Sequence, residues 1–239
     1  MTEFVRQDQI LMSAADNYHR YQVEMLLPYL KGDVLEIGGG IGNITYQVLR
    51  QSGRMTSLTC IEADSDCCAK LVAGPFPNHL DIKIIHGLFP DKIPENRSFD
   101  LIYHFNVLEH IEDDDQALSV CFQLLKPGGI HFIFVPAFPF LYGSMDRVLE
   151  HHRRYRRKEL IRKLELSGHR VLQSRYCNPI GFLGWLVNNR ILKIQEQQNK
   201  QIRFFNRYIL PVQSRVERRL CMPFGQSLCM VASKDCLLS

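Results

Sequence analysis

Apolar residues recur along this chain in short runs that alternate with longer amphipathic stretches. Such runs occupy residues 34–37, 57–61, 82–89, 99–110, 130–136, 170–176 and 227–233, and each is typical of a buried strand, the fourth with the edge of the predicted sheet included. Between them, residues 44–49, 66–72, 113–125 and 158–167 carry apolar positions at helical spacing, and residues 13–30 do so ahead of the first run. Strands that alternate with helices predict an α/β fold with a mostly parallel sheet.

Glycines follow the first predicted strand directly, in the segment 36–43, which reads Glu-Ile-Gly-Gly-Gly-Ile-Gly-Asn. Glycine lets the backbone approach a ligand closely and adopts the positive φ that tight turns need. A dinucleotide-binding turn has its third glycine one position later, where this chain has Asn43. Glu36 stands two residues before Gly38 and is an acceptor suited to a positively charged amino group rather than to a pyrophosphate.

A second acidic residue, Glu62, ends the second predicted strand, 20 positions beyond Gly42. At this interval a carboxylate reaches both hydroxyls of a ribose in nucleotide-binding α/β proteins. The turn and Glu62 together therefore predict a nucleoside-containing ligand.

These residues resemble the class I S-adenosylmethionine-dependent methyltransferases, and more narrowly the type 11/12-like bacterial enzymes that act on small molecules. Residues 124–129, Leu-Leu-Lys-Pro-Gly-Gly, which precede another predicted strand, extend the resemblance. It implies a Rossmann-like, seven-stranded, mostly parallel sheet with an antiparallel final hairpin, helices on both faces and a helical insertion before the last strand. It also implies S-adenosylmethionine as cofactor and S-adenosylhomocysteine as product.

On this basis we expect a single methyltransferase domain over residues 1–239. Residues 1–30 form an N-terminal lid helix, 31–177 the cofactor-binding core, 178–226 a helical insertion that covers the substrate, and 227–239 the last strand. The alternatives for the insertion are a dimer contact and a membrane surface.

The resemblance also implies which residues hold the cofactor. Family members usually place Asp after the glycine that ends the third strand, whereas Gly87 is followed here by Leu88, so we expect apolar packing against adenine. Tyr18 and Tyr21, three positions apart on one helix face, either close the lid or pack on the domain. The predicted cofactor-binding residues are Glu36, Gly38, Gly40, Asn43, Glu62, Ala63, Leu88, Asn106, Tyr18 and Tyr21.

A histidine-rich and arginine-rich loop follows residue 149. It is similar to a subgroup motif, Gly-His-x-Arg-Arg-Tyr-Thr-Arg-x-x-Leu, with His151 assigned to the glycine, His152 to the histidine and Arg156 to the threonine. Because imidazole titrates near neutrality, we predict His152 as the catalytic residue, with His110 second, and a structural histidine as the alternative. The predicted acceptor-binding residues are Tyr142, Arg153, Tyr155 and Trp185.

No metal is expected. Asn106-x-x-Glu109-His110 is similar to a divalent-ion motif of some methyltransferases, Glu-x-x-Glu-His with a distant histidine, but the first position here is a neutral amide. The pair Glu109-His110 is also common in relatives that bind no metal.

Charge is distributed unevenly along the chain. Residues 1–149 contain 11 Lys and Arg against 19 Asp and Glu, whereas residues 150–219 contain 17 against 5. The basic third suits an anionic acceptor or peripheral contact with an anionic membrane, and a solvated face is the alternative. We expect no nucleic acid partner, since the basic run lacks interleaved aromatic residues.

The cysteine spacing and the hydropathy of the chain indicate its cellular compartment. Cys67 and Cys68 are adjacent and no Cys-x-x-Cys pair occurs among the eight cysteines, which argues for reduced thiols. No apolar run has the length of a membrane span and the N-terminus lacks the pattern of a signal peptide. The chain is therefore predicted to be cytoplasmic, as a monomer or homodimer.

We therefore predict an enzyme that methylates oxygen or nitrogen of a small molecule, which is anionic or lipid-linked. One alternative is a non-catalytic S-adenosylmethionine-binding or membrane-peripheral regulatory protein. An NAD-dependent oxidoreductase is disfavoured, because the glycine spacing differs and no Tyr-x-x-x-Lys pair follows the fourth strand.

Overall fold

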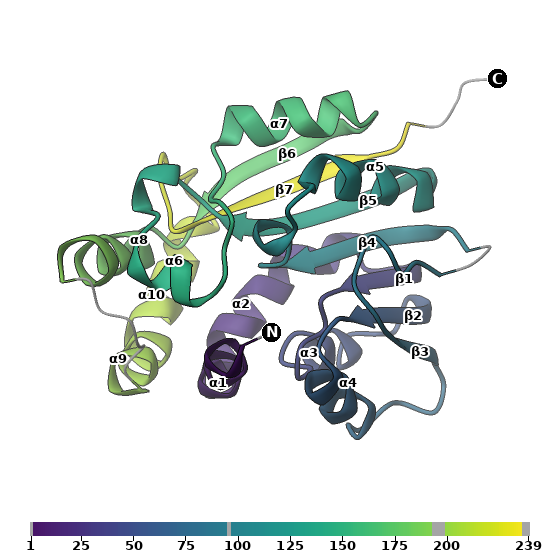
Figure 1. The fold of residues 1–239 in the computed structure, drawn as a ribbon, viewed down its shortest axis with the longest axis horizontal. Helices are drawn as coiled ribbons and strands as arrows, with labels where there is room; N and C mark the ends of the chain where they lie inside the picture. The colour runs from purple at the N-terminus through teal and green to yellow at the C-terminus, as the bar shows by residue number, and fades with distance from the viewer. Residues whose placement is uncertain (1, 95–96, 193–198, 236–239) are drawn as a thin grey trace.

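The computed structural model describes residues 2–94, 97–192 and 199–235. Within these residues, seven strands form one sheet in the order β3-β2-β1-β4-β5-β7-β6 (Figure 1). Neighbours from β3 to β5 run parallel, whereas β7 is antiparallel to both β5 and β6. The predicted sheet and its antiparallel final hairpin are confirmed. The strands are β1 (Gly32–Ile37), β2 (Met55–Glu62), β3 (Asp81–His86), β4 (Phe99–Phe105), β5 (Leu125–Pro136), β6 (Arg170–Cys177) and β7 (Ser227–Ser233).

Helices cover both faces of this sheet. Val34 and Leu35 are adjacent and fully buried, yet each belongs to a different apolar cluster, because successive strand residues point to opposite faces. The Leu35 cluster includes residues of α5 and α7, and the Val34 cluster includes residues of α2 and α3. The helices of the core are α1 (Glu3–Met12), α2 (Asp16–Leu26), α3 (Thr45–Leu49), α4 (Ser65–Val72), α5 (Asp114–Leu124), α6 (Ser144–Val148) and α7 (Arg157–Leu166).

The N-terminal segment differs from the single helix predicted over residues 13–30. It forms α1 and α2, with a break at residues 13–15, and Pro28 lies in a short 3-10 turn after α2. Helix α1 was missed because Val5 is its one buried residue, which leaves little apolar periodicity to detect.

Two strand boundaries also differ from the prediction. Strand β5 begins at Leu125 rather than residue 130, because Leu125 pairs with Phe99 before a shift in register. Strand β3 ends at His86, although the Gly87 N–H still donates to the Glu62 carbonyl at 2.9 Å.

The insertion between β6 and β7 is helical, as predicted. It contains α8 (Pro179–Trp185), a π-helical turn at Leu186–Ile191, α9 (Asn199–Phe204), another at Phe205–Ile209, and α10 (Leu210–Glu217). These helices gather beside α1 and α2 at one end of the sheet (Figure 1). Among the described residues, we find no helix with the length and apolar character needed to cross a membrane.

Candidate functional site

A cavity of about 660 Å³ lies where the glycine turn, α1, α2 and the insertion meet. Its walls are mostly apolar, and polar groups occur at a few positions. Such a composition is typical of a site for a small organic ligand. Eight of the predicted site residues line it: Tyr18, Glu36, Gly38, Gly40, Asn43, Asn106, His110 and Trp185.

The glycine turn lies directly after β1. Gly38 has a φ of 76°, and its N–H donates to the Ile61 carbonyl of β2 at 2.8 Å. A Cβ at Gly38 would lie 2.4 Å from the Val107 side chain. Both the conformation and the space therefore require glycine at this position.

Glu36, the second-to-last residue of β1, lines the cavity and is 2% exposed. Its Oε2 atom has no hydrogen-bond partner among the described residues. Burial raises the pKa of Glu36 to about 7. A buried acceptor beside a backbone turn fits the amino group of an amino-acid-like ligand, which would pair with this carboxylate.

Glu62, at the end of β2, is held by the glycine turn. Its Oε2 accepts from the Gly40 N–H at 2.7 Å and its Oε1 from the Asp64 N–H at 2.8 Å. Burial raises the pKa of the Glu62 carboxyl group. Glu62 is 3% exposed and is not among the cavity-lining residues, so its predicted bonds to ribose require the second lone pair of each oxygen.

Helix α1 contributes a residue that the sequence analysis did not single out. The Gln9 Oε1 atom accepts from the Ile41 N–H at 3.2 Å, and Asn43 Nδ2 donates to the Gln9 carbonyl at 2.9 Å. Gln9 thus lies across the glycine turn and lines the cavity. No motif marks such a residue, because the contact joins segments 32 and 34 positions apart.

The predicted tyrosine pair is divided between the cavity and the insertion. Tyr18 lines the cavity, and its ring lies 6.1 Å from that of Tyr21. Tyr21 instead donates a 2.6 Å hydrogen bond to Glu217 of α10 and is buried. Only Tyr18 is therefore in position to contact a ligand.

The other predicted cofactor-binding residues differ in whether they reach the cavity. Asn106 follows β4 with a φ of 52° and lines the cavity. Ala63 and Leu88 are not among the lining residues, and Leu88 is 60% exposed. Nothing in the structure brings Leu88 to the cavity.

The histidine loop requires a correction. His151 lines the cavity, whereas His152 is exposed and outside it. Counted back from Tyr155, the subgroup motif assigns its histidine to His151 and its glycine to Glu150, one position earlier than predicted. Glu150 has a φ of 60°, a conformation that glycine adopts most easily.

A buried set of polar bonds orients His151. The His151 Nδ1 atom lies 3.0 Å from Asp146 Oδ1, and Arg154 Nε donates to the same oxygen at 2.6 Å. The hydrogen bond from His151 and the charge of Arg154 outweigh burial and lower the pKa of Asp146 to about 2. Arg154 also lies over the Trp185 ring at 4.7 Å, which joins the insertion to this loop.

His110 is adjacent to this set. Its ring contacts that of His151 edge to face, with centroids 4.7 Å apart. Burial lowers the pKa of His110 to about 3, so the ring is neutral at pH 7. Glu109 beside it is fully buried, and burial raises the pKa of its carboxyl group to about 8.

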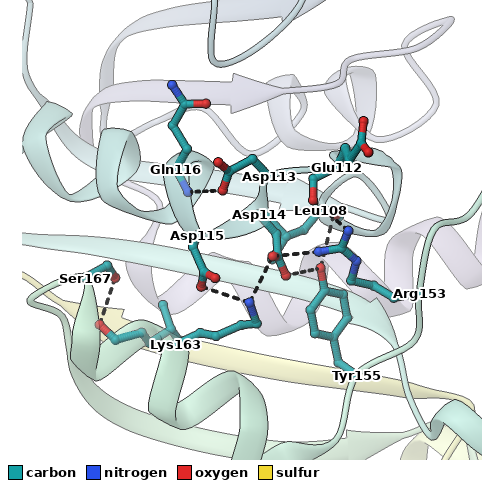
Figure 2. A network of polar contacts seen from close by, with 11 residues as sticks. Leu108, Glu112, Asp113, Asp114, Asp115, Gln116, Arg153, Tyr155, Lys163 and Ser167 are labelled. Atoms are coloured by element: carbon teal, nitrogen blue, oxygen red, sulfur yellow. Dashed lines mark hydrogen bonds and ion pairs between the residues drawn. The ribbon is translucent and has the colours of Figure 1, made fainter.

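Tyr155 and Arg153 do not reach the cavity and serve a different network (Figure 2). Tyr155 is fully buried, and its hydroxyl donates to Asp114 Oδ2 at 3.0 Å. Asp114 also pairs with Arg153 at 2.6 Å and with Lys163 at 3.0 Å. The predicted acceptor contacts of Tyr155 and Arg153 are thus replaced by contacts that join α5 to α7 and its preceding loop.

Tyr142 is a further residue outside the cavity. Its hydroxyl donates to the His151 carbonyl at 2.8 Å. Its hydroxyl therefore stabilises the histidine loop, and its side chain does not line the cavity.

Comparison with known proteins bears on this site. Residues 35–131, from β1 to β5, match the model of the family described as "Methyltransferase domain". A "Probable S-adenosylmethionine-dependent methyltransferase" of Mycolicibacterium smegmatis is 30% identical over 58% of this chain and 52% of its own length. A phosphoethanolamine N-methyltransferase of Triticum aestivum is 26% identical over 88% of this chain and 44% of its own length. The chain thus spans about half the length of these curated relatives.

Among solved structures, a methyltransferase in complex with the Haloferax volcanii Trm112 activator has the same fold. Its TM-score is 0.66 at 18% identity, and the match covers 98% of this chain and 99% of the other. At this identity the likeness shows the fold alone.

Proposed function

We propose that this chain, which carries the domain of the class I S-adenosylmethionine-dependent methyltransferases, transfers a methyl group to a small-molecule acceptor. The observation that carries the proposal is that one cavity joins Glu36 and the glycine turn to His110 and His151. A nucleoside cofactor and an acceptor can therefore be held in the same cavity.

Two groups of residues in and beside the cavity would have distinct chemical roles. Glu36, the glycine turn and Glu62 would hold S-adenosylmethionine, which supplies a methyl group on a sulfonium. His110 and His151 would accept hydrogen bonds from the hydroxyl or amine of the acceptor and so orient its nucleophilic atom. The apolar walls exclude water and preserve the strength of these bonds.

Calorimetry with the full chain tests the cofactor half of this proposal. We expect S-adenosylmethionine and S-adenosylhomocysteine to bind and NAD to give no heat. Heat with NAD alone would instead support the oxidoreductase alternative. Asp81→Ala, at an exposed carboxylate that begins β3, is a control that leaves binding unchanged.

The acceptor half is tested by release of S-adenosylhomocysteine. Phosphoethanolamine is a suitable first acceptor, because the Triticum aestivum relative is named for it. A panel of small hydroxyl and amine compounds, anionic and neutral, follows it. Cofactor binding without product release across the panel would favour the non-catalytic alternative.

The outer surface of the insertion supports contact with an anionic membrane. Its exposed apolar side chains, 38% to 59% exposed, are Ile180, Leu183, Val187, Leu192, Phe204, Tyr208, Val212, Val216, Leu220 and Phe224. Exposed basic residues lie among them at Arg203, Arg207, Arg215, Arg218 and Arg219. Apolar side chains that enter the bilayer surface and basic side chains that attract anionic headgroups together produce peripheral membrane binding. Leu183 and Phe204 also line the cavity, so a lipid-linked acceptor would enter beside the bilayer.

Vesicle flotation tests this contact. We expect the chain to float with phosphatidylglycerol vesicles and not with phosphatidylcholine alone. The double substitution Leu183→Ser and Phe204→Ser should abolish flotation. Leu166→Ser, which removes a 75% exposed leucine from α7, is the matched control and should float as before. Equal flotation of both variants would exclude the insertion as the contact.

A further inference from the structure

Three side chains in and beside the cavity bring potential metal ligands together. Glu109, His110 and His151 each offer one ligand atom, and the three atoms lie within 4.8 Å of one another. Glu109 and His110 come from the segment after β4, whereas His151 comes from the loop after α6. The fold thus joins residues 41 positions apart along the chain.

The hydrogen bond between His151 and Asp146 determines which ring nitrogen of His151 could bind a metal. Asp146 also accepts from Arg154 and from the Gly143 N–H, so it is a carboxylate, and His151 Nδ1 donates to it. In a neutral imidazole with this hydrogen bond, Nε2 carries the lone pair that could bind a metal. It points to the Oε1 atom of Glu109, 4.0 Å away.

Glu109 faces this nitrogen with two further acceptors. Its side chain is fully buried, and neither carboxylate oxygen has a hydrogen-bond partner among the described residues. A buried carboxylate without a partner is costly. A divalent cation between the two side chains would give the Glu109 oxygens a partner.

We propose that Glu109, His110 and His151 bind a divalent transition-metal cation. Two imidazoles and one carboxylate suit zinc, manganese, cobalt or ferrous ions. Three protein ligands leave coordination positions free, and both histidines line the cavity, so these positions face the proposed acceptor. Asp146 is a positioning residue, because it fixes the tautomer and orientation of His151.

This site contains the Glu-His pair and the distant histidine of the motif considered in the sequence, but not its first ligand. The neutral Asn106 in that first position argued against a metal. In the structure, His151 completes the set and Asn106 is not part of it. The sequence alone does not show which distant histidine the fold brings to Glu109 and His110.

The role of the cation rests on the proposed function. With a cation bound, His110 and His151 would orient the hydroxyl or carboxylate of the acceptor through the metal instead of by direct hydrogen bonds, and the Lewis acid would favour loss of a hydroxyl proton. Metal binding itself is independent of that role, so it can be tested separately.

The experiment measures metal binding to the full chain. We expect about one equivalent of Zn²⁺ or Mn²⁺ by elemental analysis after dialysis, and a Co²⁺ derivative with visible absorption bands from nitrogen and oxygen ligands. Glu109→Gln and His151→Gln should abolish stoichiometric binding. Asp146→Asn should weaken it roughly 10- to 100-fold. His152→Gln, the adjacent exposed histidine, should bind as the wild type does.

Two outcomes would overturn the proposal. The first is wild-type protein that takes up none of these ions, and the second is Glu109→Gln protein that binds as tightly as the wild type. Should Glu109→Gln fail to fold, the His151→Gln variant and the wild-type Co²⁺ spectrum decide. Calorimetry with S-adenosylmethionine in EDTA distinguishes failure of this proposal from failure of the proposed function. Protein that binds the cofactor but takes up no metal rejects only the metal site. Protein that takes up metal but does not bind the cofactor rejects the proposed function.

Discussion

The Nδ1 atom of His151 lies 3.0 Å from Oδ1 of Asp146, five positions earlier in the chain. A carboxylate at this place favours one tautomer and orientation of the imidazole, and Nε2 then lies 4.0 Å from Glu109 Oε1. His151 is therefore oriented for function, whereas His152 beside it is exposed.

Replacing His151 and His152 by alanine in separate variants should distinguish their roles. We expect His151→Ala to lower the turnover number roughly 100-fold or more, since the acceptor loses an orienting imidazole. His152→Ala should retain wild-type turnover. Both variants should bind S-adenosylmethionine with unchanged affinity, measured by calorimetry. Equal turnover of the two variants would contradict the assignment of His151.

Glu62 provides a test of the cofactor site. Removal of its carboxylate takes away the predicted bonds to ribose and the bonds from Gly40 and Asp64 that fix the turn. Glu62→Ala should therefore weaken binding of S-adenosylmethionine by about 1.5–3 kcal/mol. A thermal melt without cofactor shows whether the variant is folded. Unchanged affinity in a folded variant would remove Glu62 from the site.

The sequence was sufficient for the sheet and for the glycine turn. Buried strands are short apolar runs, and the segment 36–43 combines glycines with an acidic residue, so both have a local signal. Helix α1 had no such signal. Its Gln9 contacts the turn through polar bonds, and polar contacts leave no periodic pattern.

The histidine loop and its register could both be read from the sequence, because the motif counted back from Tyr155 assigns its histidine to His151. The assignment to His152 was one position too late, and the positive φ of Glu150 agrees with the glycine of the motif at that position. Tyr155 was misassigned for a different reason. A tyrosine suits either an acceptor or a buried carboxylate, and only the fold brings Asp114 to its hydroxyl.

Three buried histidines should make stability depend on pH. His104 on β4, His131 on β5 and His169 before β6 lie together, with His131 Nδ1 3.1 Å from His169 Nε2. Burial lowers the pKa of His104 to about 3 and that of His169 to about 4. For His131, burial and the neighbouring histidines lower the pKa well below its usual value. All three are neutral in the folded chain at pH 7.

The unfolded chain binds protons at these histidines near pH 6.5, whereas the folded chain does not until about pH 4 or below. Their contribution to stability is therefore complete above pH 6.5 and is lost as the pH falls toward 4. We expect the free energy of unfolding to fall by about 1 kcal/mol per histidine per pH unit in this window. Urea titrations at pH 7 and pH 5.5 measure it, and His104→Leu should show a smaller difference than the wild type.

Substitutions of Tyr155 and Trp185 should have different effects, because Tyr155 is a structural residue and Trp185 lines the cavity. Tyr155→Phe removes the hydrogen bonds to Asp114 and to the Leu108 carbonyl, at 3.0 and 3.1 Å in the buried network (Figure 2). We expect it to lower the free energy of unfolding by about 1–3 kcal/mol, because buried acceptors lose their donor. The KM for the acceptor should not change. Trp185→Ala, which alters the cavity wall and uncovers Arg154, should raise that KM instead. Urea denaturation and steady-state kinetics on both variants test this contrast, and a raised KM in Tyr155→Phe would return Tyr155 to the acceptor site.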